Sequence, residues 1–218
     1  MSGREHFDRE LADLRRQLHD LGLLVLDANE RTIDALKRND LTLAAQVAEN
    51  DHVVNVAQHR VEEHAILLIA RQQPVARDLR VIITAISAGA ELERIGDYAK
   101  AIARLLIGAQ QSPPLAPPDE LLALAAAAQT MLTHAIESLT TGSVEQAQAL
   151  AAEEVALDLR YRDLRQQLNA SLAGHSHPAR VADLLAVAHY IERIADRATN
   201  VAERVIYGAS ARIVDLNP

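Results

Sequence analysis

The segments ELERIGDYAKAIAR at 91–104 and HYIERIADRATNVAER at 189–204 decide how this chain is interpreted. In each segment a glutamate is followed four residues later by an aspartate. On a helix that spacing places two negative charges on one face, which is mildly destabilising unless a positive group lies nearby. The two acidic pairs are Glu93 with Asp97 and Glu192 with Asp196.

The two segments are copies of one pattern. At an offset of 99 residues, 93–104 and 192–203 share six identical residues, and the apolar positions upstream correspond as well. For the preceding helix of each half, an offset of 103 residues matches apolar positions in the same way. Self-similarity over this length indicates that the chain is a duplication of one helical unit.

Apolar residues recur with the alternating four- and three-residue spacing of a long helix that packs at a shallow angle. In the first helix they are Phe7, Leu11, Leu14, Leu18, Leu21, Val25 and Ala28. A turn at Arg38–Asp40 ends this helix, and Pro74 is predicted to lie in the first turn of the third. The predicted helices cover about 7–38, 41–71, 74–107, 120–140, 143–172 and 178–210.

The segment GAQQSPPLAPPDE at 108–120 carries four of the chain's seven prolines. Such a stretch stops a helix and extends stiffly, so it marks the boundary between two halves. We therefore predict an all-α fold of two tandem, sequence-similar three-helix bundles with six long antiparallel helices. The predicted domains are residues 1–110 and 120–218, joined by the proline-rich linker 111–119.

The composition excludes several classes of function. The chain has 218 residues, of which 49% are hydrophobic and only 2% aromatic, and it contains no cysteine. Disulfides, thiolate zinc sites and iron–sulfur clusters are therefore excluded. A net charge of −8 without a lysine-rich block argues against nucleic-acid binding.

The sequence predicts no membrane-spanning segment. The longest apolar runs, such as LLALAAAA at 121–128, are far shorter than the ~20 residues that span a bilayer. The start of the chain is charged and lacks the apolar core of a secretory signal, so we expect a cytoplasmic protein. Alanine-rich helix faces such as 121–132 suit a homodimer, and they suit a contact inside the chain equally well.

The acidic pairs continue the apolar stripes of their helices. The stripe of the third helix ends in Glu93 and Asp97, and that of the sixth ends in Glu192 and Asp196. The steps of three and four residues keep each stripe on one helix face. The second and fifth helices behave in the same way, and their polar residues are Asp51 with Asn55 and Glu154 with Asp158.

Residues at equal distance from the turn of an antiparallel helix hairpin lie at the same height. With Pro74 and the GHSHP turn at 174–178 as the two turn centres, all eight polar residues are level with a partner across their hairpin. We therefore expect one oxygen-rich quartet in each half. The level pairs are Asp51 with Asp97, Asn55 with Glu93, Glu154 with Asp196, and Asp158 with Glu192.

Carboxylates that converge from two helices repel one another by several kcal/mol in a medium of low dielectric constant. A multivalent cation removes this repulsion, and all-oxygen ligands suit hard ions such as Mg²⁺, Mn²⁺ or iron. The alternative to a metal site is that the acidic face of each helix is solvated or forms ion pairs with basic side chains of the chain. The residues available for such pairing are Arg80, Arg94, Lys100, Arg193 and Arg197.

Two longer segments around the acidic pairs resemble the signature segments of the PhoU family. They are RQQPVARDLRVIITAISAGAELERIGDYAKAIAR at 71–104 and YIERIADRATNVAERVIY at 190–207. The likeness extends over almost the whole chain, including NDLTLAAQVAENDHVVN at 39–55. The resemblance implies two similar three-helix bundles, each with a cluster of divalent or trivalent metal ions. Iron, zinc, manganese and magnesium are the candidates.

Carried over position by position, the resemblance assigns metal-binding roles to the residues already singled out. The chain departs from the family pattern at Ala195, where glycine is common, and at Tyr98 and Arg197, where histidine is common. Because Asn55 is neutral, we expect the first half to retain metal less firmly. The implied ligands are Glu93, Asp97, Glu192 and Asp196, with Asp51, Asn55, Glu154 and Asp158 in companion places.

The resemblance also implies a function. Members of the family restrain phosphate uptake and the phosphate-starvation response, acting between the ATPase subunit of a phosphate ABC transporter and a membrane sensor histidine kinase. This chain is therefore expected to be a non-enzymatic, metal-binding adaptor that reaches the membrane only through these partners. The first alternative is an oxygen-ligated metalloenzyme, phosphatase-like or di-metal, for which the motifs supply no nearby nucleophile or general base. The second is a scaffold whose acidic stripes are only electrostatic surfaces.

Overall fold

The structure is a computed structural model that describes residues 3–111, 116–172, 174 and 176–217, so residues 112–115 of the predicted linker lie outside it. Six long helices account for nearly all of the described chain, as the sequence predicted, and a short 3₁₀ turn, η1 (Ala109–Gln111), follows the third. The helices are α1 (Gly3–Arg38), α2 (Leu41–Gln72), α3 (Ala76–Gly108), α4 (Asp119–Thr141), α5 (Val144–Leu172) and α6 (Pro178–Ser210).

The ends of the helices follow from local chemistry. Asp40 caps α2, because its side chain accepts a hydrogen bond from the backbone N–H of Leu43 at 3.0 Å. Asn39 and Gly142, with φ of 52° and 69°, adopt the left-handed conformation that ends α1 and α4. Both turns lie where the sequence predicted them.

One predicted helix start was wrong. α3 begins at Ala76, so Pro74 lies in the turn ahead of the helix rather than in its first turn. Gln73, just before the proline, has a φ of 46° and closes α2. Because proline has a fixed φ and no N–H to satisfy, it suits this short turn as well as it suits a helix start.

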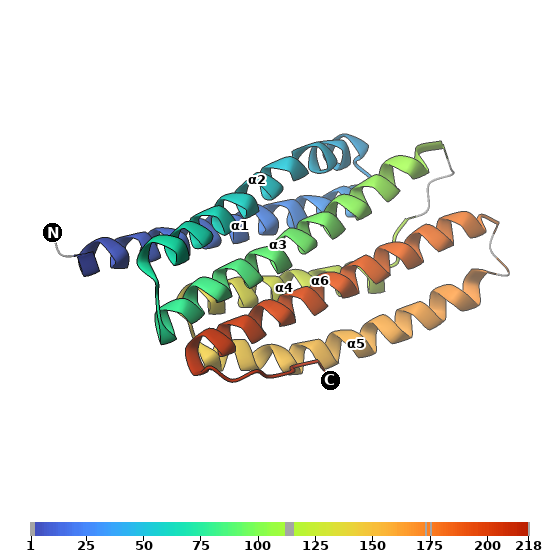
Figure 1. Ribbon diagram of the computed structural model, residues 1–218. Helices are drawn as coiled ribbons and strands as arrows, with labels where there is room; N and C mark the ends of the chain where they lie inside the picture. The colour runs from blue at the N-terminus through green and yellow to red at the C-terminus, as the bar shows by residue number, and fades with distance from the viewer. Residues whose placement is uncertain (1–2, 112–115, 173, 175, 218) are drawn as a thin grey trace.

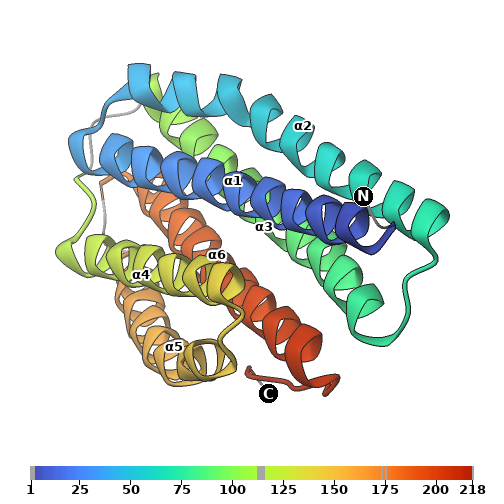
Figure 2. The ribbon, with the colours of Figure 1, turned by 90° about the vertical axis from the view of Figure 1, so that its left-hand side faces the viewer.

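Each half of the chain forms a three-helix bundle, and the two bundles lie side by side (Figures 1 and 2). α1, α2 and α3 pack against one another, as do α4, α5 and α6. The bundles join through α3 against α6 and α1 against α4, so α2 and α5 form the outer edges of the molecule. Across the described residues, no helix is both long and apolar enough to cross a bilayer.

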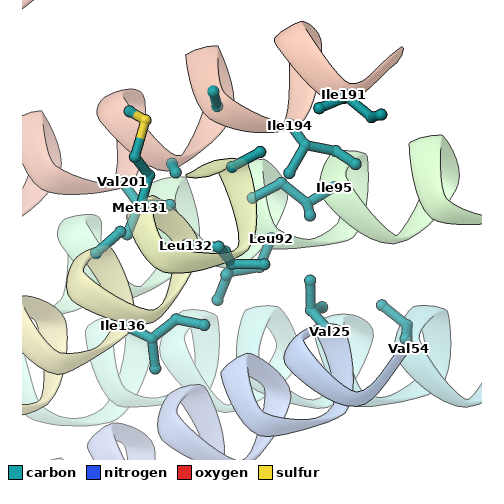
Figure 3. Close-up of a cluster of buried hydrophobic side chains, with 14 of the residues drawn as sticks. Val25, Val54, Leu92, Ile95, Met131, Leu132, Ile136, Ile191, Ile194 and Val201 are labelled. Atoms are coloured by element: carbon teal, nitrogen blue, oxygen red, sulfur yellow. The ribbon is translucent and has the colours of Figure 1, made fainter. Parts of the chain in front are cut away.

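A single hydrophobic core joins the two bundles. Figure 3 shows Val25 of α1, Leu92 of α3, Leu132 of α4 and Ile194 of α6 in one cluster. All four are almost completely buried. Removing such a side chain from water stabilises the fold by about 1.5–3 kcal/mol, before the loss of conformational entropy is counted. The two copies of the repeat therefore share their core, and the domain boundaries predicted at 110 and 120 stay a prediction.

α3 and α6 pack antiparallel at the centre of the molecule. Contacting residues advance along α3 by the same number of positions as they retreat along α6. The contact therefore relates the two halves by an approximate two-fold axis. Glu93 and Glu192 therefore lie at similar levels along the molecule. The pairs that define this register are Thr84 Oγ1 with Arg204 O at 3.3 Å, Glu91 Oε2 with Arg197 Nη1 at 3.0 Å, and the stacked rings of Tyr98 and Tyr190, whose centroids are 5.9 Å apart.

Candidate metal centre

The quartet of the second half comes together between α5 and α6. Glu154 and Asp158 lie on α5, and Glu192 and Asp196 lie on α6. The charge of Asp158 acts on each of the other three carboxylates, which places all four side chains in one electrostatic environment. The structure therefore gathers the four residues that the sequence placed level with one another.

Burial makes four negative charges unfavourable here. It raises the pKa of Glu154 to about 7, against the lowering effect of a hydrogen bond from Thr199, and the charge of Asp196 adds to the rise. Burial raises the pKa of Glu192 to about 7 as well, with Asp196 again the next contributor. It also raises the pKa of Asp196, which Arg193 opposes. A proton or a cation bound at this cluster would relieve the repulsion.

Glu154 is the most deeply buried member of the quartet, with 1% of its surface exposed. Thr199 Oγ1 donates a hydrogen bond to its Oε2. Nδ2 of Asn217 donates to Glu154 Oε1 at 3.3 Å and to Asp196 Oδ1 at 3.2 Å. Because these donors are uncharged, they satisfy the oxygens of Glu154 without neutralising its charge.

Glu192 and Asp196 differ in how well they are paired. Arg193 forms an ion pair with Asp196. Oε2 of Glu192 is buried and accepts no hydrogen bond, although Nδ1 of His189 lies 3.3 Å away. A buried oxygen without a partner costs about 1–3 kcal/mol, and more for a charged group. The quartet therefore keeps an oxygen that a cation would satisfy.

The quartet of the first half, between α2 and α3, is arranged differently. Asp51 is 8% exposed and forms an ion pair with Lys100. Nδ2 of Asn55 lies 3.4 Å from Asp51 Oδ2, and the amide oxygen of Asn55 is buried without a hydrogen-bond partner. A lysine of the chain therefore already neutralises the most buried acid of this quartet.

Glu93 and Asp97 complete the first quartet on α3. Burial raises the pKa of Glu93, and the charges of Asp97 and, more weakly, Asp51 add to it, while Arg94 opposes the rise. Arg94 lies 3.8 Å from Glu93 and 3.9 Å from Asp97, but its side chain is 63% exposed. Exposed ion pairs contribute only about 0–1 kcal/mol, so this arginine leaves both carboxylates free to bind a ligand.

Lys100 and Thr199 were not identified as partners of the quartets from the sequence. They occupy the same place in the repeat, three residues after each acidic pair, and they contact the corresponding acids Asp51 and Glu154. In the sequence Lys100 is one of several available cations, and Thr199 carries no charge that would single it out. A comparison of the two repeats at an offset of 99 places Lys100 and Thr199 at the same position, but it does not show which acid each side chain contacts.

The donor set fits a hard cation, and it fits better in the second half. Each quartet holds one buried oxygen without a hydrogen-bond partner, on Asn55 and on Glu192, and oxygen donors suit hard ions. Within the described part of the chain, no three aspartate, glutamate or histidine side chains already surround one point as a metal site. An ion would therefore take over interactions that Lys100 and Arg193 now make with Asp51 and Asp196.

Fold and site together define a class of protein: an all-helical molecule of two repeated three-helix bundles, each with an acidic quartet between its last two helices. The family model described as "PhoU domain" matches this chain twice, at residues 18–106 and 121–205. The chain belongs to the PhoU family, as its signature segments indicated.

Relatives with assigned names match over nearly the full length. The chain is 30% identical to the phosphate-specific transport system accessory protein PhoU homolog of Streptococcus pneumoniae, over 98% of this chain and 100% of that protein. It is 34% identical to the Rhizobium meliloti homolog, over 94% and 87% of the two chains. The crystal structure of PhoU from Pseudomonas aeruginosa superposes with a TM-score of 0.89 at 30% identity, over 94% and 100% of the two chains. These matches confirm the predicted fold.

Proposed function

We propose that this protein is a metal-binding regulatory accessory of a phosphate transport system, which restrains phosphate uptake and the phosphate-starvation response. The proposal rests chiefly on the match to phosphate-specific transport system accessory proteins over 98% of the chain. Similarity to the phosphate transport system regulatory protein PhoU of Streptococcus pneumoniae, with a TM-score of 0.89 at 25% identity over 96% and 99% of the chains, supports it. On this account the protein is an adaptor in the cytoplasm rather than an enzyme.

The proposed partners are the ATPase subunit of a phosphate ABC transporter and a membrane sensor histidine kinase. The names of the relatives, which describe accessory proteins of a transport system, support an association with transport machinery. We also propose a homodimer, formed through helix faces other than 121–132, because Leu124, Ala125 and Ala128 of that stretch are buried inside the chain. Sedimentation equilibrium of the purified chain tests the dimer, and a monomer at micromolar concentration would exclude it.

Metal is proposed to bind first at the second quartet and more weakly at the first. In the second, the cation would supply positive charge to four carboxylates that include the buried Glu154. The bound cation would also hold α5 and α6 together near their middle. The proposed ions are iron, zinc, manganese or magnesium. The residues that would hold them are Glu154, Asp158, Glu192 and Asp196 in the second half, and Asp51, Asn55, Glu93 and Asp97 in the first.

Deletion of the gene tests the regulatory role. In phosphate-rich medium, phosphate-starvation transcripts should rise in the deletion strain and return to their low level when the wild-type gene is restored. Unchanged transcripts would exclude the proposed function, whatever the metal content of the protein.

Complementation with variants tests whether metal matters for that role. Glu192→Ala/Asp196→Ala should restore repression poorly. The matched control is Glu30→Ala/Asp34→Ala, which removes a carboxylate pair of the same spacing from α1. If both double variants restore repression equally, the second quartet has no regulatory part.

A direct assay distinguishes the metalloenzyme alternative from the proposed adaptor. Purified protein loaded with Mn²⁺ should not hydrolyse phosphomonoesters above the rate of the Glu192→Ala/Asp196→Ala variant. Turnover that disappears in that variant would favour an enzyme over an adaptor.

A further inference from the structure

The chain does not end with α6 but turns back over the second quartet. Ala211, with a φ of 60°, closes α6, and residues 211–217 run as an extended segment beside α5 and α6 (Figure 1). Figure 2 shows the same segment returning from the end of α6. This C-terminal segment, residues 211–217, has no periodic pattern and no motif, and the sequence did not predict its position.

Two anchors hold the C-terminal segment independently of the quartet. Val214 and Leu216 are partly buried and pack against the hydrophobic core. The backbone N–H of Leu216 donates to Glu203 Oε1 at 2.9 Å. Glu203 lies about two turns beyond Asp196 on α6. The segment therefore has two anchors that do not involve the quartet.

The anchors place the side chain of Asn217 at the quartet. Its Nδ2 bridges the two helices, at 3.3 Å from Glu154 Oε1 on α5 and 3.2 Å from Asp196 Oδ1 on α6. Asn217 itself is exposed, so its amide stands between these carboxylates and the solvent. In the first half the chain after α3 continues into η1 and on towards α4, so nothing equivalent is built there from the described residues.

An asparagine amide offers two donors on nitrogen and an acceptor on oxygen. In the structure the nitrogen faces the carboxylates. A half-turn of the amide about its last bond presents the oxygen instead, and amide oxygens are ordinary ligands of hard cations. The same side chain can therefore donate to the carboxylates or bind a cation among them without movement of the backbone.

We propose that the C-terminal segment is a strap that closes the second metal site and that Asn217 contributes a neutral oxygen ligand to its cation. This inference rests on the proposed metal function. It adds to the four carboxylates a ligand from outside the helices and gives the site a cover that slows the escape of the ion. The opposite possibility is that Asn217 is a plug, which occupies the carboxylates and is expelled when metal binds.

The rate of Mn²⁺ loss to excess EDTA distinguishes a ligand from a plug. The measurement is made in the Glu93→Ala/Asp97→Ala background, so that only the second site is loaded. In that background Asn217→Ala should release Mn²⁺ on the order of tenfold faster, the size typical of a lost supporting contact at a metal site. Asn217→Asp should release it no faster than the parent. Asn169→Ala, an exposed asparagine on α5, is the matched control.

Slower release from Asn217→Ala would show a plug, and an unchanged rate would show that the amide is not a ligand; either result overturns the proposal. If the parent binds no Mn²⁺, the metal function itself fails and the strap fails with it. A second readout is hydrogen exchange of the Leu216 amide, which should slow when Mn²⁺ is added to the wild type. Faster exchange would mean that metal expels the segment.

Discussion

The acidic quartets of the two halves occupy equivalent places in a duplicated bundle, yet their buried acids have different partners. In the first half Asp51 is paired with Lys100, whereas in the second Glu154 accepts a hydrogen bond from Thr199. An ammonium group cancels the charge of a buried carboxylate, and a hydroxyl group does not. The comparison teaches that a change of partner at one position of the repeat leaves a buried acid paired with a cation of the chain in one half and without such a cation in the other.

The second half also holds more acid. Its quartet has four carboxylates and the pKa of two of them, Glu154 and Glu192, rises to about 7. The first quartet has three carboxylates, because Asn55 takes the fourth place.

The largest expected effect is the loss of metal from the second half. Glu192→Ala/Asp196→Ala removes two of the four carboxylates, so the tighter Mn²⁺ binding step should weaken by roughly 100-fold or more, beyond the about 10- to 100-fold cost of losing a supporting residue. Glu93→Ala/Asp97→Ala should leave that step intact and remove a weaker one. Isothermal titration of both variants measures this, and a tighter step that depends on Glu93 and Asp97 would reverse the comparison.

The stability of the metal-free protein should depend on pH through the second quartet. The folded pKa values of Glu154 and Glu192 lie near 7, above the ordinary value of 4.5, so the folded state binds more protons between these limits. The stability that these groups contribute is complete below pH 4.5 and is lost as the pH rises through 7, by a few kcal/mol (~3) for the cluster as a whole.

Urea unfolding in EDTA at pH 5 and pH 8 measures this loss. Glu192→Gln should flatten the pH dependence, and Mn²⁺ should restore stability at pH 8. A metal-free protein that becomes more stable over this interval would contradict the assignment.

Lys100→Thr gives the first half the partner residue of the second. Breaking a buried ion pair leaves Asp51 without its cation, so the metal-free protein should lose about 3 kcal/mol of stability. Mn²⁺ should then bind the first quartet about tenfold more tightly, because the cation replaces the ammonium group. Lys37→Thr, at an exposed position on α1, controls for loss of a lysine. Unchanged Mn²⁺ affinity in Lys100→Thr would show that the lysine does not distinguish the two halves.

The smallest effect is expected from Arg94→Ala. This arginine and Arg193 occupy the same place in the repeat. The side chain of Arg94 is 63% exposed and that of Arg193 is 33% exposed. Arg193 also lies closer to Asp196 than Arg94 does to Asp97. Arg94→Ala should change the free energy of unfolding by less than about 1 kcal/mol, and Arg193→Ala should cost more. Thermal unfolding of both variants checks the order, which the account requires.

The sequence was sufficient to predict the helices and the acidic quartets. Apolar periodicity locates each helix, and equal distance from a turn places Asp51 level with Asp97 and Glu154 level with Asp196. These features depend only on helix geometry and on hairpin connections, which sequence spacing expresses directly.

The partners of the quartets were harder to predict, because they depend on side-chain positions and on the packing of unlike segments. Lys100 and Thr199 reach their acids through particular side-chain conformations. Asn217 reaches the second quartet only because the segment after Ala211 folds back over it. The central contact of α3 with α6 was also absent from the prediction. It depends on close approach at Gly208, where an added Cβ would lie 2.7 Å from Thr84 Oγ1.

Anomalous scattering from a crystal grown with Mn²⁺ tests the central claim most directly. The account predicts the strongest anomalous peak among Glu154, Asp158, Glu192 and Asp196, with a weaker peak or none beside Asp51. A crystal in which the second quartet stays bound to Arg193 and Asn217 without a peak, at Mn²⁺ concentrations that fill the first, would contradict it.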